Sequence, residues 1–140
     1  MLNNRAVVVV VPAYQEEAHI GGVIETMPRF VDHIIVVDDA SLDRTGAIAH
    51  GSGDERVRVI RHPERRGVGA AIATGYAAAL ELTQDADDAV AVMAGDGQMS
   101  PDDLERVLLP VVSGQADYVK GDRFGEPGVR RSMGLPRWIG

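Results

Sequence analysis

The sequence predicts an α/β fold, with a mostly parallel sheet and helices on both of its faces. Short apolar runs rich in β-branched residues alternate along the chain with segments whose apolar residues recur at helical spacing. Turn or helix-capping residues separate these segments. Such alternation favours parallel strands joined by helical crossovers, so we expect five strands and four helices in one domain.

The first half of the chain supplies three of the expected strands. The unbroken apolar run 6–11 is typical of a strand buried on both faces, and the proline that follows should end its hydrogen bonding. Apolar residues at helical spacing over 20–27 predict the first helix. A second strand over 33–37 precedes a helix over 42–50. The third strand, 57–60, alternates with arginines, which indicates a more exposed position in the sheet.

The second half continues the alternation. Small residues over 68–82 predict a helix that packs closely on the sheet, and 88–93 reads as another strand buried on both sides. Ser100 is an expected N-cap, because proline and two acidic residues follow it, and that helix should run to about Val112. A fifth strand is expected over 116–120, before a loop-like C-terminal stretch.

The composition excludes several classes of site. Hydrophobic residues make up 45% and charged residues 25% of the 140-residue chain, as in globular proteins that are not membrane-embedded. There is no cysteine, which removes disulfides, thiolate chemistry and cysteine-based zinc sites. The four histidines are scattered without metal-ligand spacing, so we expect surface or capping roles for them.

Charge is distributed unevenly along the chain. The net charge is −7, yet residues 120–140 hold five basic and two acidic residues. The acidic body argues against a nucleic-acid partner, whereas the basic end could meet phosphate or an anionic membrane surface. No run of 18 apolar residues is present, and the first apolar run lacks a signal-peptide cleavage site. We therefore expect a cytoplasmic location, at the inner face of the membrane if the acceptor is a lipid.

Polar residues follow four of the expected strands: 12–17, Asp38–Asp39, 96–98 and 121–123. Ligands of parallel α/β sheets bind beyond the carboxyl ends of the strands, so these residues should converge on one site. Asp96 and Gln98 project the same way if their backbone is extended, and the neighbouring glycines would let a ligand approach closely. Their hard oxygen atoms suit Mg²⁺ or Mn²⁺ shared with a phosphate-bearing substrate.

Three familiar phosphate sites do not fit the sequence. Ile72 stands where a dinucleotide-binding fingerprint beginning at Gly67 needs glycine, and no Gly-Lys-Ser/Thr P-loop is present. A phosphoacceptor receiver domain would place its acidic pair after the first strand and an acceptor aspartate after the third. Here the first strand ends at Pro12 and the third at Arg61-His62.

Five motifs, in order and across nearly the whole chain, resemble family 2 glycosyltransferases of the GT-A type, nearest the polyprenyl (dolichol) phosphate mannosyl- and glucosyltransferases. They are Val-Val-Pro-Ala-Tyr-Gln-Glu-Glu at 10–17, Val-Val-Asp-Asp-Ala-Ser-Leu-Asp-Arg-Thr at 36–45, Gly-Val-Gly-Ala-Ala-Ile-Ala-Thr-Gly-Tyr at 67–76, Ala-Gly-Asp-Gly-Gln-Met-Ser-Pro at 94–101 and Val-Lys-Gly-Asp-Arg-Phe at 119–124.

The resemblance implies a GT-A-like fold and inverting, metal-dependent transfer of a hexose from a GDP- or UDP-sugar to an acceptor such as polyprenyl phosphate. The residues that would line the nucleoside pocket or bind the base are Pro12, Tyr14, Glu16, Asp38 and Asp39. Those that would hold Mg²⁺ or Mn²⁺ are Asp96 and Gln98, and those expected to face phosphate groups, including the acceptor's, are Arg123 and Arg130 or Arg131. We expect Asp96 and Arg123 to be catalytic.

The sequence departs from the family pattern at two positions and in length. Ala94 stands where the family often has a further aspartate, and Arg65 stands where asparagine is common. We expect residues 1–140 to form one nucleotide-sugar-binding domain that is incomplete at its C-terminus. Two alternatives therefore stay open: a non-catalytic nucleotide-sugar-binding module, and an oligomerising module whose exposed sheet edge needs a second chain.

Overall fold

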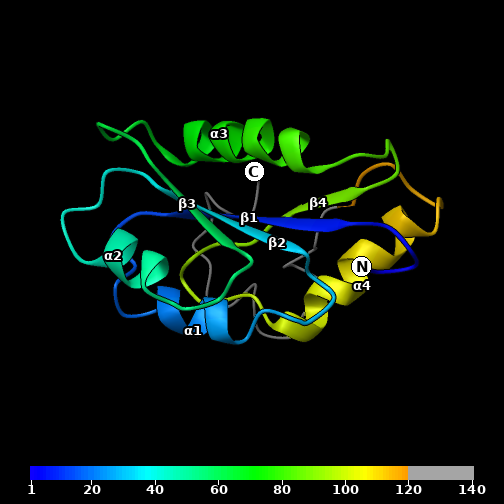
Figure 1. The fold of residues 1–140 in the computed structure, drawn as a ribbon, viewed down its shortest axis with the longest axis horizontal. Helices are drawn as coiled ribbons and strands as arrows, with labels where there is room; N and C mark the ends of the chain where they lie inside the picture. Colours follow the sequence, from blue (N-terminus) through cyan, green and yellow to red (C-terminus); the bar gives the residue numbers. More distant parts are fainter. Residues whose placement is uncertain (120–140) are drawn as a thin grey trace, which may run out of the picture.

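The structure, a computed structural model, describes residues 1–119, in which strands and helices alternate from end to end (Figure 1). In chain order the elements are β1 (Val7–Ala13), α1 (Ile20–Glu25), β2 (His33–Asp38), α2 (Thr45–His50), β3 (Val57–Arg61), α3 (Val68–Leu82), β4 (Ala89–Val92) and α4 (Pro101–Val112).

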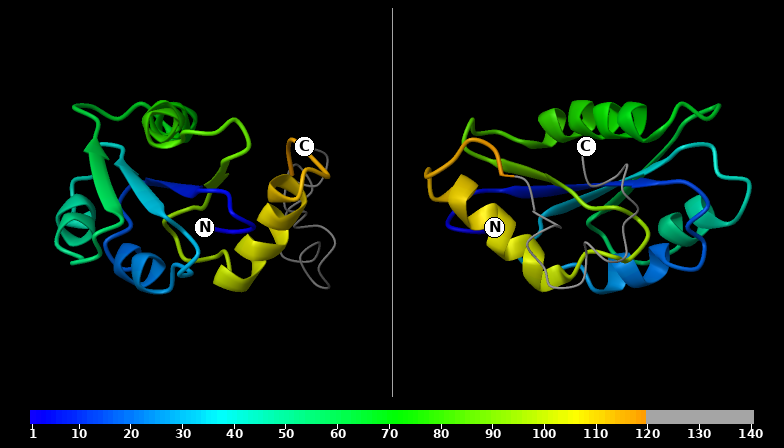
Figure 2. Two further views of the ribbon diagram at one scale, coloured as in Figure 1. Left: turned by 45° about the vertical axis from the view of Figure 1, so that its right-hand side comes forward. Right: turned by 180° about the vertical axis from the view of Figure 1, so that it is seen from behind.

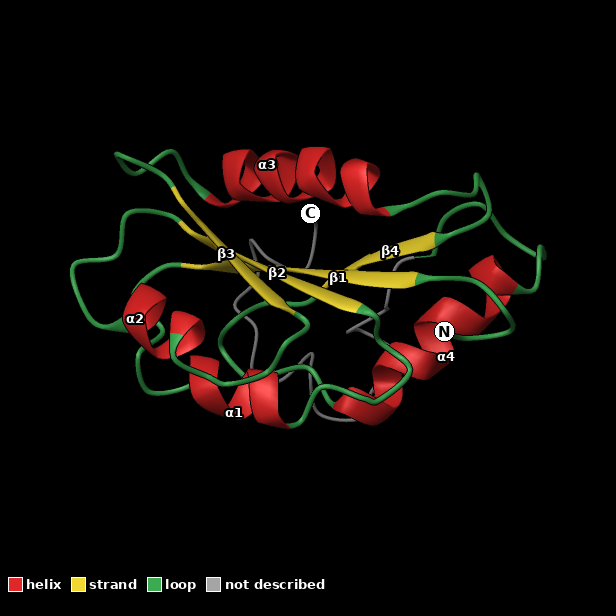
Figure 3. Cartoon of the chain, viewed as in Figure 1, coloured by secondary structure: helices red, strands yellow, loops and turns green. Residues whose placement is uncertain are grey.

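Within these residues the four strands form one parallel sheet in the order β3-β2-β1-β4 (Figure 3). The register pairs Val10 of β1 with Ile35 of β2 on one side and with Val92 of β4 on the other. All seven residues of β1 are buried, because it lies between two strands and beneath helices on both faces. The parallel α/β architecture predicted from the sequence is confirmed.

Helices cover the two faces of the sheet unequally. Figure 1 and the turned views of Figure 2 show α3 alone above one face and α1, α2 and α4 on the other. The apolar core divides in the same way. The smaller cluster contains Val8, Val10 and the buried alanines of α3, and the larger one contains Val7, Val9 and Val11 with α1 and α4.

Gly75 sets how closely α3 lies on β1. A Cβ atom at Gly75 would collide with the side chain of Val10. Ala71, Ala78 and Ala79 on the same side of the helix are buried against the sheet. The small residues thus permit close packing, as predicted, and the packing fixes the position of the loop that leads into α3.

Several helix and strand ends differ from expectation. Pro12 lies inside β1, which continues to Ala13. Its missing N–H is tolerated because it falls on the β4 side, where β4 has already ended at Val92. Helix α2 begins at Thr45, because the Asp43 side chain accepts a hydrogen bond from the Thr45 N–H (3.0 Å). The expected N-cap is confirmed, since the Ser100 hydroxyl accepts a bond from Asp102 N (3.3 Å).

Two predictions were wrong: a fifth strand over 116–120, and burial of the 88–93 strand on both of its sides. Residues 116–119 form no strand, and Lys120 lies outside the described residues. In β4, Ala89 and Ala91 are buried while Val90 and Val92 are only partly buried. The reason is that α3 packs mainly on β1 and β2 and only marginally on β4. Among residues 1–119, no helix has the length and apolar character needed to cross a membrane.

Candidate functional site

The carboxyl ends of β2, β1 and β4 are tied together by backbone hydrogen bonds. The N–H of Asp39 donates to the carbonyl of Ala13 (2.9 Å), and the N–H of Gly95 donates to the carbonyl of Pro12 (3.3 Å). Because β1 is the middle strand, Tyr14 follows it between Asp39 on one side and Asp96 on the other. The structure thus brings three of the predicted site residues to one edge of the sheet.

Asp38 is fully buried, and both of its carboxylate oxygens have protein partners. Oδ1 accepts a hydrogen bond from the Ser41 N–H (3.0 Å), and Oδ2 forms an ion pair with Arg61 Nη1 (2.6 Å). Arg61 also donates to the carbonyl of Ser41 (2.9 Å). Asp38 therefore fixes the turn after β2, and contact with a nucleobase would have to replace one of these partners.

Asp39 is the centre of a second buried network. Its side chain accepts hydrogen bonds from the backbone N–H groups of Arg66 and Gly67 and from Nδ1 of His62, each at 2.8 Å. Burial raises the pKa of the Asp39 carboxyl, but the bonds from Arg66, His62 and Gly67 outweigh burial and hold that pKa below its ordinary value. A carboxylate can accept about four hydrogen bonds, so one acceptor position remains on Oδ2.

His62 is a member of this network that the sequence reading missed. It is only 4% exposed, so the expectation of a surface histidine was wrong here. Its Nε2 lies 2.8 Å from the hydroxyl of Thr74 on α3, so the imidazole links Asp39 to that helix. Its place immediately after β3, at the same sheet edge as Asp39, is the signal that could have indicated a buried role.

The guanidinium group of Arg65 lies over the ring of Tyr14. The guanidinium carbon of Arg65 lies 3.8 Å from the ring centroid, within the range of a cation–π contact. Arg65 comes from the loop between β3 and α3, which includes the residues that bind Asp39. The contact joins this loop to the end of β1.

The segment after Tyr14 is held by the loop before α2 and by the first residue of that helix. The N–H of Gln15 donates to the Ser41 hydroxyl and the N–H of Glu16 to the Thr45 hydroxyl, both at 2.9 Å. The carboxylate of Glu16 lies 3.1 Å from Nδ1 of His19. Glu16 is therefore held near the sheet edge in a stable loop, on the same side of the sheet as α2.

The tip after β4 is a turn, so the extended backbone that would make Asp96 and Gln98 project the same way is not what the structure shows. Oδ1 of Asp96 accepts a hydrogen bond from the Gln98 N–H (3.0 Å), and Gly97 has a φ of 74°. Gly95 is buried, and a Cβ there would lie 3.1 Å from Cβ of Ala13. The close approach at Gly95 is thus to β1, and the approach of a ligand to this turn stays a prediction.

Asp96 is suited to bind a metal ion together with phosphate oxygens of a ligand. It is not part of a metal site made of protein side chains alone within residues 1–119. Over residues 1–119, its Oδ2 accepts no hydrogen bond, and no three His, Cys, Asp or Glu side chains are gathered around a common point. Mg²⁺ in phosphate-transfer sites commonly takes one or two carboxylates together with phosphate oxygens and water. A free carboxylate oxygen on a partly exposed turn fits that kind of binding.

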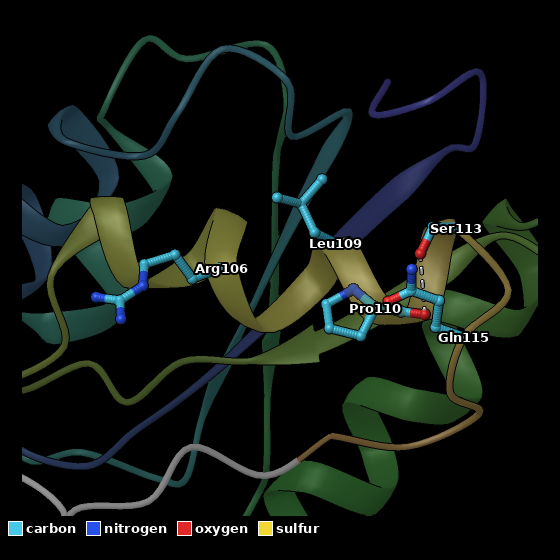
Figure 4. A pocket seen from close by; sticks show the side chains of 5 residues that line it. All are labelled: Arg106, Leu109, Pro110, Ser113 and Gln115. Atoms are coloured by element: carbon cyan, nitrogen blue, oxygen red, sulfur yellow. Dashed lines mark hydrogen bonds between the residues drawn. The ribbon is translucent and has the colours of Figure 1, made fainter.

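The remaining predicted site residues, Arg123, Arg130 and Arg131, lie outside the described residues. A cavity of about 480 Å³ is found elsewhere, along the C-terminal half of α4 (Figure 4). Arg106, Leu109, Pro110, Ser113 and Gln115 line it. Since α4 begins after the Asp96 turn and runs back along the sheet, this cavity lies away from the candidate site (Figure 1).

Comparison with known proteins assigns the family. The sequence pattern of Glycosyl transferase family 2 matches residues 8–139, nearly the whole chain. The chain belongs to glycosyl transferase family 2. The resemblance seen in the five sequence motifs is thereby confirmed.

Relatives of this family 2 chain include enzymes named for lipid-phosphate acceptors. It is 33% identical to a UDP-N-acetylglucosamine–dolichyl-phosphate N-acetylglucosaminyltransferase of Methanococcus voltae, over 98% of this chain and 59% of the relative. It is also 33% identical to a polyprenol monophosphomannose synthase of Mycolicibacterium smegmatis, over 94% of this chain and 50% of that protein. The chain therefore spans about half the length of these curated relatives.

The fold is shared with glucosyl-3-phosphoglycerate synthase of Mycobacterium tuberculosis. Its structure in complex with Mn²⁺, uridine diphosphate and phosphoglyceric acid superposes with a TM-score of 0.63 and 30% identity, over 79% of this chain and 40% of that one. The GT-A-like fold predicted for the family 2 chain is thereby confirmed.

Proposed function

We propose that this chain transfers a hexose, with inversion, from a nucleoside diphosphate sugar to polyprenyl phosphate, with the help of Mg²⁺ or Mn²⁺. The observation that carries the proposal is the convergence of Tyr14, Asp39 and Asp96 at one sheet edge in a family 2 glycosyltransferase. Two relatives are named for dolichyl or polyprenol phosphate acceptors, which supports this acceptor class.

The donor nucleoside binds between β1 and β2 in this proposal, with Pro12, Tyr14 and Glu16 on one side and the Asp38–Asp39 segment on the other. Asp39 has one acceptor position left after its three protein hydrogen bonds. That favours uracil, whose N3–H is a single donor, over guanine, whose corresponding edge presents two donor groups. UDP bound in a structural neighbour points in the same direction.

Asp96 and Gln98 provide the metal-binding side of the proposed site. A divalent ion held by these residues would offset the negative charge that develops on the diphosphate as the sugar is transferred. Asp96 offers one free carboxylate oxygen, so the donor's phosphates would have to supply further ligands. Ion affinity should consequently be weak until the nucleotide is present.

The acceptor side of the proposal uses arginines beyond residue 119. A phosphate monoester is already anionic near neutral pH, so it needs positioning and charge neutralisation and no catalytic base. Arg123 would stabilise the reacting phosphate groups, and Arg130 and Arg131 would bind the acceptor phosphate, because arginine binds phosphate oxygens with two donors at once. We also propose that the chain contacts the membrane surface and that two copies of it associate.

A second candidate function is nucleotide-sugar binding without transfer. Ala94, where the family often has aspartate, favours it, since the described residues offer Asp96 as the single acidic group of the tip. In this case UDP would bind with a divalent ion, and no glycosylated lipid would form.

The test is to incubate the purified chain with Mn²⁺, a short-chain polyprenyl phosphate and, separately, UDP-N-acetylglucosamine, UDP-glucose and GDP-mannose. We expect a glycosylated lipid phosphate from one UDP-sugar, and no product from the Asp96→Asn variant or after chelation of the ion. Nucleotide binding without product would support the second candidate. A folded sample that neither binds nucleotide nor forms product would contradict both.

A further inference from the structure

The arginine above Tyr14 is placed where the proposed donor must pass. The nucleoside side of the site is at Asp39 and the metal side is at Asp96, and the end of β1 lies between them. Tyr14 is the first residue after β1, and Arg65 covers its ring at 3.8 Å. A diphosphate that extends from one side to the other therefore crosses the Tyr14–Arg65 pair.

The backbone around Arg65 is held firmly by its neighbours. The next two N–H groups, of Arg66 and Gly67, both donate to Asp39 at 2.8 Å. His62, three residues earlier, bonds to the same carboxylate and to Thr74 on α3. Asp39 and His62 are both buried, so the loop from 62 to 67 is fixed on a network that solvent does not reach. The guanidinium is thus presented from a preformed loop.

The hydrogen-bond donors of Arg65 remain available to a ligand. A cation–π contact uses the charge of the guanidinium and leaves its N–H groups free to donate. Over residues 1–119, Arg65 forms no salt bridge, whereas Arg61 on the preceding strand is paired with Asp38. Asp38, Asp39 and Asp96 place three carboxylates at this edge, so an anionic donor needs cations there.

We propose that Arg65 is a donor-binding residue that contacts the diphosphate, with Tyr14 as its support and with His62 and Asp39 as positioning residues for its loop. The proposal rests on the proposed function, since it assumes a nucleoside diphosphate donor at this edge. Arginine in place of the asparagine common in the family gives this chain two aligned N–H donors for phosphate oxygens.

The test measures calorimetric dissociation constants for UDP, UMP and uridine with Mn²⁺ present, in the wild-type chain and in five variants at Arg65, Arg66 and His62. Arg65→Asn removes the cation and restores the common family residue, and Arg65→Lys keeps the charge without the paired donors. Arg66→Asn is the matched control, because it removes the same charge from the adjacent exposed position while keeping the backbone N–H that binds Asp39.

We expect Arg65→Asn to weaken UDP binding by about tenfold and uridine binding by less than about twofold, with Arg65→Lys between wild type and Arg65→Asn. Arg66→Asn should change UDP binding by less than about twofold. His62→Gln should reproduce part of the UDP loss, and His62→Ala more of it, if His62 acts by positioning the loop.

Three results would overturn the inference while leaving nucleotide binding in place: unchanged UDP affinity in Arg65→Asn, equal losses in Arg65→Asn and Arg66→Asn, or equal losses for UDP and uridine. The second would indicate a general charge effect, and the third a contact with the nucleoside instead of the phosphates. A wild-type chain that binds none of the three ligands would instead overturn the proposed function, and this inference with it.

Discussion

The acidic residues at the ends of β2 and β4, on the same sheet edge, have opposite surroundings. Asp38, the last residue of β2, and Asp39 after it are buried, and each of their carboxylate oxygens has a protein partner. Asp96 after β4 is partly exposed, and within residues 1–119 it accepts one hydrogen bond, from the Gln98 N–H. The difference agrees with two proposed roles: Asp38 and Asp39 mainly hold the loops of the site, with one acceptor position left on Asp39 for the base, whereas Asp96 keeps a whole oxygen free for the metal.

The largest expected effect is on stability, from Asp39→Asn. The asparagine amide would point N–H groups at backbone N–H donors of Arg66 or Gly67, leaving buried groups unsatisfied. We expect a loss of about 3 kcal/mol in the free energy of unfolding, measured by urea denaturation. Asp96→Asn, at a partly exposed turn, should change that free energy by less than about 0.5 kcal/mol. Equal losses in the two variants would contradict the division of roles.

A second test changes the support of the Asp39 network without touching its polar groups. Gly75→Ala would push α3 away from Val10 and shift the adjacent Thr74, which contacts His62. We expect a loss of about 2 kcal/mol in the free energy of unfolding from overpacking.

Gly69→Ala is the matched control for that substitution, because a Cβ at Gly69 meets no atom within 4 Å. It should stabilise the chain by about 0.5 kcal/mol through higher helix propensity. Thermal unfolding of both variants, followed by circular dichroism, provides the measurement. If Gly75→Ala left the free energy of unfolding unchanged, α3 would not pack on β1 as closely as described.

A smaller effect concerns pH. Because the folded-state pKa of Asp39 lies below its unfolded value, near 3.9, its ionisation stabilises the fold at pH values above that unfolded value. This contribution is lost as the pH falls through the folded-state pKa. The stability difference between wild type and Asp39→Asn, from urea curves between pH 7 and pH 3, should therefore shrink in the acid range. A difference that stays constant down to pH 3 would contradict the lowered pKa of Asp39 in the folded chain.

Local sequence signals predicted most of the fold. The apolar run of β1, the helical spacing of α1 and the Ser100 cap of α4 each depend on near neighbours in the chain, and each is confirmed with small shifts at the ends. The absence of a strand over 116–119 and the partial exposure of β4 were missed. They depend on which elements lie beside a segment in space, which a short window of sequence does not encode.

The location of the candidate site was predicted from the sequence, but the hydrogen bonds and packing within it were not. The rule that ligand sites lie at the carboxyl ends of parallel strands was enough to bring Tyr14, Asp39 and Asp96 together. The burial of His62 and the packing of Gly95 on Ala13 required the strand order, because both contacts join segments far apart in the sequence. The turn at Asp96 has a local cause, the Asp-Gly pair, whose turn propensity outweighed the extended backbone assumed from the preceding strand.

The most direct test of the central claim is the metal dependence of UDP binding, measured by calorimetry in the wild-type chain and in Asp96→Asn, each with Mn²⁺ and with EDTA. We predict that Mn²⁺ tightens UDP binding to the wild-type chain about tenfold, and that Asp96→Asn abolishes this gain while its affinity in EDTA equals that of the wild type. An undiminished Mn²⁺ effect in Asp96→Asn would contradict the claim that the turn after β4 binds the metal.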